Sequence, residues 1–234
     1  MDSTYHRTDS TYRTYMTNSI KAQILETGLI PVIRADSSDI AMRAVDAIRQ
    51  GGISVLEITM TVPGAIRIIE DVTRRFGDDA IVGAGTVLDS ETARACILAG
   101  AQFIVSPALD LDTIACCRRY SIPVMPGAMT PSEVVTAWKA GADLVKIFPA
   151  HALGGPSYLK ALKAPLPQVE LIPTGGVSLK NASDFIKAGA AALGVGTDLV
   201  DTAALRSGED QVITTRAKQF IGIVKTAREE LVTP

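Results

Sequence analysis

The stretch "AGADLVKIFPA" (residues 140–150) contains the repeating unit on which the fold depends. Its Ala-Gly-Ala start joins the end of a helical segment to a run of apolar and β-branched residues that is typical of a buried strand. Lys146 interrupts this run, although lysine is almost never fully buried without a partner or a function. The stretch therefore predicts a helix-to-strand junction that carries an amine into the interior of the protein.

The same junction recurs along the chain. Ala-Gly-Ala also stands at 99–101 and 188–190, and Gly51-Gly52 occupies the equivalent place earlier. Apolar runs alternate with amphipathic helical stretches, and "TPSE" (130–133) is a helix start with a Thr cap, Pro at the first position and Glu reaching back. The predicted strands are 29–34, 54–59, 80–86, 103–106, 123–127, 143–148, 170–176 and 192–196. The pattern indicates repeated βα units.

Eight strands, each followed by a helix, within about 215 residues predict the α/β class and a single (β/α)8 TIM barrel with a short N-terminal helix. A doubly wound sheet is the alternative, because both folds bury parallel strands. The Gly-rich phosphate-loop fingerprint that usually accompanies that fold is absent after the first strand. Residues 19–234 are expected to form the barrel domain. Residues 1–18 are polar and nearly free of aliphatic side chains, which predicts a disordered N-terminal extension.

Composition limits the function classes. The chain has 234 residues, 47% of them hydrophobic, and a formal net charge of −2 without basic blocks, so nucleic acid and anionic membrane surfaces are not expected partners. Neither a membrane span nor a signal-peptide core is apparent. The three cysteines lack metal-ligand spacing and are typical of reduced thiols in a cytoplasmic protein. Only two histidines occur, which argues against histidine metal sites and Ser-His-Asp catalysis.

Two ionisable residues, Glu57 and Lys146, interrupt otherwise apolar strands near their C-terminal ends, where barrel enzymes carry their active sites. One interpretation is a buried structural ion pair, which gains little over apolar packing because desolvation offsets the attraction. The other is a covalent nucleophile. Burial that lowers the amine pKa from about 10.4 to 7–8 corresponds to roughly 4 kcal/mol and leaves a useful fraction unprotonated. Such an amine forms a Schiff base with a carbonyl substrate while the carboxylate moves protons.

The last two strands end in glycine-rich segments, "PTGG" (173–176) and "GVGT" (194–197). Their backbone N–H groups and the Thr197 hydroxyl are suited to holding an anion, a common use of the last two loops in such barrels. Tight-turn glycines alone would explain either motif singly. Both together predict a phosphate site.

Six motifs, in this order, strongly resemble one enzyme family: "LEITMTVPGA", "GAGTVL", "FIVSP", "MPGAMTPSEV", "VKIFPA" and "PTGGVSL". The family is that of 2-keto-3-deoxy-6-phosphogluconate (KDPG) aldolase and 4-hydroxy-2-oxoglutarate aldolase, and the resemblance runs from about residue 20 to the C-terminus. It implies a class I, metal-independent aldolase on a TIM barrel, usually a homotrimer, without a cofactor.

The resemblance also implies roles for single residues. Lys146 becomes the Schiff-base lysine, Glu57 the acid/base, and Thr86 a neighbour of the pyruvyl carboxylate. The remaining substrate-binding residues that it implies are Pro107, Phe148, Thr174, Gly175, Gly176, Gly196 and Thr197, the last five near the phosphate. Thr197 replaces the usual Ser and keeps the hydroxyl.

One departure concerns the carboxylate of the substrate. Several members carry Arg four residues after the glutamate, whereas this chain has Thr61 there. We expect Arg34, at the end of the first strand, to supply the missing charge as a carboxylate clamp. The alternative is that Arg34 only braces its loop through a carboxylate such as Asp36.

The expected reaction is cleavage of KDPG to pyruvate and glyceraldehyde 3-phosphate, so the expected partners are a small keto acid and a sugar phosphate. Cleavage of the galactonate epimer or of 4-hydroxy-2-oxoglutarate to pyruvate and glyoxylate stays open. Two other classes also stay open. A sugar-phosphate isomerase would not need an amine in an apolar strand, and in a non-catalytic phosphometabolite-binding barrel Lys146 would only pair with the charge of the ligand.

Overall fold

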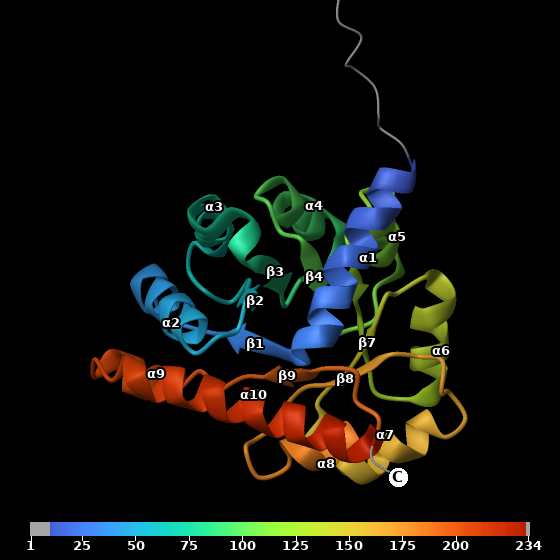
Figure 1. Ribbon diagram of the computed structural model, residues 1–234. Helices are drawn as coiled ribbons and strands as arrows, with labels where there is room; N and C mark the ends of the chain where they lie inside the picture. Colours follow the sequence, from blue (N-terminus) through green and yellow to red (C-terminus); the bar gives the residue numbers. More distant parts are fainter. Residues whose placement is uncertain (1–9, 233–234) are drawn as a thin grey trace, which may run out of the picture.

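The computed structural model describes residues 10–232, and in it parallel strands alternate with helices (Figure 1). The strands are β1 Leu29–Ile33, β2 Val55–Thr59, β3 Ile81–Gly85, β4 Phe103–Val105, β5 Val124–Met125, β6 Gly127–Ala128, β7 Val145–Ile147, β8 Leu171–Pro173 and β9 Leu193–Val195. The α-helices are α1 Ser10–Thr27, α2 Ser38–Gln50, α3 Ala65–Phe76, α4 Ser90–Leu98, α5 Leu111–Arg119, α6 Pro131–Ala140, α7 Pro156–Lys163, α8 Ala182–Lys187, α9 Thr202–Arg206 and α10 Asp210–Val232. Two 3-10 turns, η1 Gly77–Asp79 and η2 Ala150–Leu153, follow α3 and β7.

The strands form two parallel sheets, one of six strands in the order β5-β4-β3-β2-β1-β9 and one of three in the order β6-β7-β8. Two parallel bridges, Leu171↔Ala190 and Thr174↔Gly194, connect β8 and the residue after it to the segment of β9. The prediction of an α/β fold with buried parallel strands is confirmed, and the sheet curls into a half-barrel with helices on its outside.

The predicted fifth strand, 123–127, is interrupted at Pro126 and becomes β5 and β6. Proline has no N–H to donate to a strand ladder, which explains the break. Its carbonyl oxygen still accepts a hydrogen bond from the backbone N of Lys146 at 2.9 Å. The interruption therefore leaves β7, which carries Lys146, attached to its neighbour.

The predicted helix-to-strand junctions are confirmed and share one backbone feature. Gly52, Gly100, Gly141 and Gly189 all have positive φ, between 92° and 99°. Glycine adopts this left-handed conformation without steric cost, so it ends each helix and turns the chain into the next strand. Thr130, Pro131 and Glu133 also form the predicted capping box at the start of α6.

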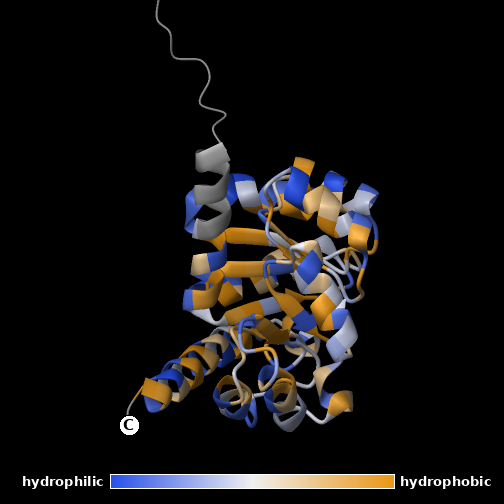
Figure 2. Cartoon of the chain, turned by 90° about the vertical axis from the view of Figure 1, so that its right-hand side faces the viewer, coloured by the Kyte–Doolittle hydropathy of each residue, from blue (hydrophilic) through white to orange (hydrophobic). Residues whose placement is uncertain are grey.

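The interior contains two apolar clusters. The larger lies between the strands and the outer helices, and the smaller joins strand residues such as Val55, Ile81 and Phe103 to Ile20 and Ile24 of α1. Figure 2 shows the hydrophobic strands stacked through the centre of the molecule, with hydrophilic residues on the helices around them. Helix α1 therefore covers strand residues near their N-terminal ends, opposite the predicted active site.

Arg228 of α10 fastens α1 in this place. Its guanidinium donates to the carbonyl oxygens of Leu25 at 2.6 Å, Glu26 at 2.7 Å and Ala191 at 3.1 Å. Burial lowers the pKa of Arg228. The bonds to Leu25 and Glu26 satisfy carbonyl groups in the last turn of α1, which have no partner within the helix itself.

The N-terminal helix is longer than the sequence predicts. It begins at Ser10, so residues 10–18 are helical although they belong to the segment expected to be disordered. Once the turn around Ile20 and Ile24 is anchored in the core, each further residue adds a hydrogen bond at little cost in nucleation. The rest of the predicted extension, residues 1–9, lies outside the described residues.

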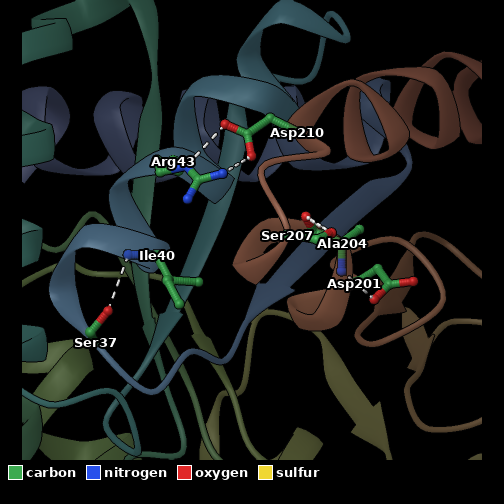
Figure 3. Close-up of polar contacts among 7 residues, drawn as sticks. All are labelled: Ser37, Ile40, Arg43, Asp201, Ala204, Ser207 and Asp210. Carbon is green, nitrogen blue, oxygen red and sulfur yellow. Dashed lines mark hydrogen bonds and ion pairs between the residues drawn. The ribbon is translucent and has the colours of Figure 1, made fainter.

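Ion pairs fasten the segment after β9 to the start of α2. Arg43 of α2 pairs with Asp210 at the start of α10 through both nitrogens that face it, with Nε 3.1 Å from Oδ2 (Figure 3). A second pair joins Arg206 of α9 to Asp36. These contacts hold the loop that follows β1 beside the loop that follows β9.

Cys96, Cys116 and Cys117 are buried and form no disulfide. Burial raises the pKa of Cys96 to about 11 and that of Cys117 to about 12. Thiols with such high pKa values are poor nucleophiles at neutral pH. Among residues 10–232, no helix is both long and apolar enough to cross a membrane.

Candidate active site

Lys146 on β7 and Glu57 on β2 are both buried, each with 2% of its surface exposed. Among the described residues they form no ion pair with each other, and Glu57 Oε1 has no hydrogen-bond partner. The interpretation as a structural ion pair is therefore wrong, although each charge acts on the other through space. The Nζ atom of Lys146 lies 5.0 Å from the ring centroid of Phe148.

Burial drives both groups toward their neutral forms. Burial raises the pKa of the Glu57 carboxyl, and the positive charges of Lys146 and Arg34 oppose the rise. Burial also lowers the pKa of the Lys146 amine; the Glu57 carboxylate opposes this change, and Arg34 adds to it. A neutral amine is a nucleophile, and a carboxyl whose pKa lies nearer neutrality exchanges protons readily.

Gly85, at the end of β3, makes room for Glu57. A Cβ atom at position 85 would lie 1.9 Å from Glu57 Oε1 and 2.6 Å from its Cδ. The space that glycine leaves is therefore occupied by the carboxylate itself. Gly85 was not predicted from the sequence, because its contact with Glu57 joins two neighbouring strands and leaves no local signal.

Arg34 lies at the end of β1 and is exposed. It makes no hydrogen bond or ion pair within the described part of the chain. A cavity of about 300 Å³ is lined by Arg34, Asp36, Thr61, Thr197 and four further residues. Asp36 pairs with Arg206 instead, so the alternative in which Asp36 holds Arg34 is wrong. The guanidinium is free to meet an anion.

A second cavity of about 190 Å³ shares Arg34 and Thr197 with the first. Its lining contains most of the predicted phosphate residues: Arg34, Phe148, Thr174, Gly175, Gly176, Val177, Ser178, Gly196, Thr197 and Asp198. The backbone N–H groups of Gly176, Val177, Gly196 and Thr197 donate to no acceptor among the described residues. Unpaired N–H groups on two adjacent loops are suited to holding a phosphate group.

Thr174 belongs to this lining but is largely buried, because its side chain packs against Gly194 of β9. A Cβ atom at position 194 would lie 2.1 Å from Thr174 Oγ1. Gly175 and Gly176 have φ values of 88° and 76°. These left-handed residues turn the chain at the end of β8, and a non-glycine residue would be strained there.

Most predicted site residues therefore converge. Lys146 and Glu57 lie in the interior, and Phe148 and Arg34 connect this pair to the glycine-rich loops. Two predicted residues, Thr86 and Pro107, do not line either cavity. Thr86 has a φ of 57°, which is rare for a β-branched residue and indicates local strain at the end of β3. Pro107 instead packs through its carbonyl against Gly127, where an added Cβ would lie 2.2 Å away.

Asp198 was also not predicted from the sequence; it follows Thr197 in the turn after β9 and lines the second cavity. Its Oδ2 accepts a hydrogen bond from the backbone N of Leu179 at 2.9 Å. Within residues 10–232, no group of three or more His, Cys, Asp or Glu side chains is arranged to hold a metal ion.

Comparisons with known proteins agree with this geometry. The family model described as KDPG and KHG aldolase matches residues 20–216. The chain is 38% identical to 2-dehydro-3-deoxy-6-phosphogalactonate aldolase of Escherichia coli over 86% of this chain and 95% of that protein. It is 36% identical to 2-dehydro-3-deoxy-phosphogluconate aldolase of Dickeya dadantii over 85% and 93%.

A solved structure of KDPG aldolase from Legionella pneumophila, with pyruvate captured as a covalent carbinolamine intermediate, superposes with a TM-score of 0.79. The two chains are 32% identical, and the match covers 85% of this chain and 96% of that one. The match of the family model and the identities over most of both lengths lead to one conclusion: the chain belongs to the KDPG and KHG aldolase family.

Proposed function

We propose that this chain is a class I aldolase that cleaves KDPG to pyruvate and glyceraldehyde 3-phosphate through a Schiff base on Lys146. The observation that carries the proposal is a buried amine whose pKa is lowered, beside a buried carboxyl whose pKa is raised, next to an anion-binding cavity. The relatives named for phosphogluconate aldolase support the choice of substrate.

In the first half of the reaction, the neutral Lys146 amine attacks the keto carbon of the substrate, and loss of water gives a protonated imine. This cation withdraws electrons from the adjacent carbon. The ring of Phe148, 5.0 Å from Nζ, adds an attraction between the cation and the ring face. No metal ion is required, because the iminium does the polarising that a Lewis acid would otherwise supply.

Glu57 moves the protons. Its carboxylate takes the proton from the hydroxyl on the carbon that becomes the aldehyde, and the carbon–carbon bond breaks to give glyceraldehyde 3-phosphate and an enamine. The protonated Glu57 then returns a proton to the enamine carbon, and water releases pyruvate from Lys146. The unpaired Oε1 and the raised pKa of Glu57 support both steps.

The two ends of the substrate need different anion sites. The N–H groups of the loops after β8 and β9 are suited to the phosphate, with the Thr197 hydroxyl beside them. Arg34 is the proposed clamp for the keto-acid carboxylate, because its charge is close enough to shift the pKa values of Glu57 and Lys146 and it has no ion-pair partner among the described residues. Thr86 stays a proposed contact at the pyruvyl end, and Pro107 stays a proposed substrate contact.

The remaining expectations are proposals of the same kind. Pairing of β9 with β1, the short Pro126 break and the two bridges to β9 support a closed (β/α)8 barrel in a domain of residues 19–234. A homotrimer is proposed from the family resemblance, and the side chains of Leu88, Leu111, Met129 and Trp138, each 43–59% exposed in one chain, are candidates for its interface. The free, buried cysteines support a cytoplasmic location.

The galactonate epimer of the substrate is the second candidate. The relative at 38% identity is named for 2-dehydro-3-deoxy-6-phosphogalactonate, and a native KDPGal structure superposes with a TM-score of 0.80 at 34% identity. The family also includes KHG aldolases, which makes 4-hydroxy-2-oxoglutarate a third substrate to test. Initial rates on the three substrates separate these proposals.

Borohydride trapping tests the Schiff base itself. Pyruvate and borohydride should add one reduced pyruvyl group to the tryptic peptide that contains Lys146, and Lys146→Arg should abolish the addition. EDTA should leave turnover unchanged. An isomerase or a non-catalytic binding barrel predicts an unchanged mass, and label on another lysine would assign the chemistry elsewhere.

Arg34→Ala tests the carboxylate clamp. The variant should raise KM for every keto acid, including pyruvate in the reverse direction, about tenfold or more, because a charge-assisted contact is lost. Circular dichroism and thermal unfolding establish that it is folded. If folded Arg34→Ala protein binds pyruvate with normal affinity, Arg34 does not hold the keto-acid carboxylate.

A further inference from the structure

The proposed phosphate cavity contains an acidic side chain. Asp198 lines it directly after Thr197, together with the unpaired N–H groups of the two glycine-rich loops. A carboxylate beside a phosphate is unfavourable, because like charges a few ångströms apart repel. The presence of Asp198 at this position therefore requires a reason other than direct contact with the anion.

The hydrogen bond of Asp198 supplies that reason. Its Oδ2 accepts from the backbone N of Leu179 at 2.9 Å. Leu179 belongs to the loop after β8 and Asp198 to the loop after β9. Within the described residues, this is the one side-chain hydrogen bond that joins segment 174–181 to segment 196–201. Asp198 thus connects the two halves of the cradle.

Each half is ordered separately. In the loop after β8, Asn181 accepts from Ser178 N at 2.8 Å and donates to the Gly176 carbonyl oxygen at 2.9 Å. Its internal shape therefore does not depend on Asp198.

In the loop after β9, Arg216 of α10 donates to the Asp198 carbonyl oxygen at 3.1 Å and pairs with Asp201 at 3.2 Å. Asp201 in turn accepts from the first N–H groups of α9, as Figure 3 shows for Ala204. Each loop thus has bonds of its own, and the Thr174↔Gly194 bridge joins the two segments at their base, so the Asp198 bond acts on the spacing of the loops beyond that bridge.

We propose that Asp198 is a positioning residue for the phosphate of the substrate: its side chain holds the two loops at the spacing at which N–H groups from both reach one phosphate. This inference rests on the proposed function, which supplies the phosphorylated substrate. The site needs the hydrogen-bond acceptor of Asp198 and not its negative charge. The charge itself weakens binding of the phosphate dianion.

Acceptor and charge are separable by substitution. Asp198→Asn keeps a side-chain oxygen for Leu179 N and removes the charge, so KM for KDPG should stay within threefold of wild type or fall. Asp198→Ala removes the bond, and KM for KDPG should rise about tenfold, the effect of losing one hydrogen bond to a charged group. Exchange of the pyruvate methyl protons in D2O, which involves no phosphate, should keep its pyruvate KM within twofold in both variants.

Asp184→Ala is the matched control. It makes the same change of residue and charge on α8, where Asp184 is exposed and outside the cavity lining, and it should leave both constants unchanged. Inhibition of pyruvate exchange by inorganic phosphate gives a second measure of the cradle, and it should weaken in Asp198→Ala only.

The outcomes are distinct. A KM for KDPG that stays at the wild-type value in Asp198→Ala, or rises equally in Asp198→Asn, overturns the positioning role. A pyruvate KM that rises in parallel assigns Asp198 to the pyruvyl end or to general stability and also overturns it. If wild-type protein neither traps pyruvate nor cleaves any of the three substrates, the proposed function fails first, and phosphate binding measured by calorimetry still decides whether Asp198 shapes the cradle.

Discussion

Substituting Gly85 by Ala should disable the acid/base while leaving the Schiff-base lysine intact. The backbone at Gly85 is not in the left-handed region, so alanine adds no backbone strain there. Its Cβ would lie 1.9 Å from Glu57 Oε1, whereas ordinary contact begins at 3.4 Å, so the carboxylate must move by about 1.5 Å. A misplacement of about 1 Å can cost roughly 10²-fold in rate, or about 2.7 kcal/mol in the activation barrier.

We therefore expect kcat for cleavage of KDPG to fall about 10²-fold in Gly85→Ala, with borohydride trapping of pyruvate on Lys146 still complete. Stopped assays with coupled detection of pyruvate measure the first quantity, and intact-protein mass spectrometry measures the second. Gly222→Ala, at a position where an added Cβ meets nothing within 4 Å, is the control for glycine replacement itself. A kcat within threefold of wild type in folded Gly85→Ala would refute the argument that Glu57 must occupy this space.

Three further predictions concern charge, packing and the N-terminus. Burial lowers the pKa of the Lys146 amine, so the rate of its reductive methylation, plotted against pH, should have a midpoint below the ordinary value of about 10.4. Glu57→Gln should lower this midpoint further, because the substitution removes the negative charge that opposes the effect of burial. A midpoint at the ordinary value would contradict the burial argument. Arg228→Met leaves three carbonyl oxygens without their donor and should lower the free energy of unfolding in urea by about 2–4 kcal/mol, with Arg228→Lys losing less. A change in the free energy of unfolding below about 0.5 kcal/mol, the range of an ordinary surface substitution, would show that water replaces the guanidinium. Removing residues 1–18 should leave kcat/KM within twofold of wild type, because Ile20 and Ile24, which pack against the strands in the smaller apolar cluster, are retained. A tenfold loss of kcat/KM would show that the removed segment is needed for activity.

The sequence predicts the parallel strands well because their signals are local. Each strand is a short apolar run, and each junction contains a glycine that the turn requires, so both are visible in a window of a few residues. Lys146 and Glu57 are visible for the same reason, since a charged residue in an apolar run has no ordinary structural explanation.

Contacts between distant segments are not visible in this way. Gly85 matters because of a side chain on the neighbouring strand, and Asp198 because of a backbone N–H nineteen positions away. The pairing of Asp36 with Arg206, which removes the alternative role of Arg34, spans 170 positions. The extent of α1 also depends on tertiary anchoring, because its polar first half contains no hydrophobic periodicity of its own.

The tie between the two ends of the chain has a consequence for synthesis on the ribosome. Strand β1 pairs with β9, from Leu29↔Leu193 to Pro31↔Val195. The carbonyl oxygens in the final turn of α1 accept hydrogen bonds from Arg228, which is synthesised near the end of the chain. A nascent chain therefore exposes one edge of its first strand until nearly the whole polypeptide has emerged. At about 5–20 residues per second, that interval lasts on the order of ten seconds or more. During this time the open edge can pair with other chains, so misassembly is a greater risk before β9 has emerged than after it.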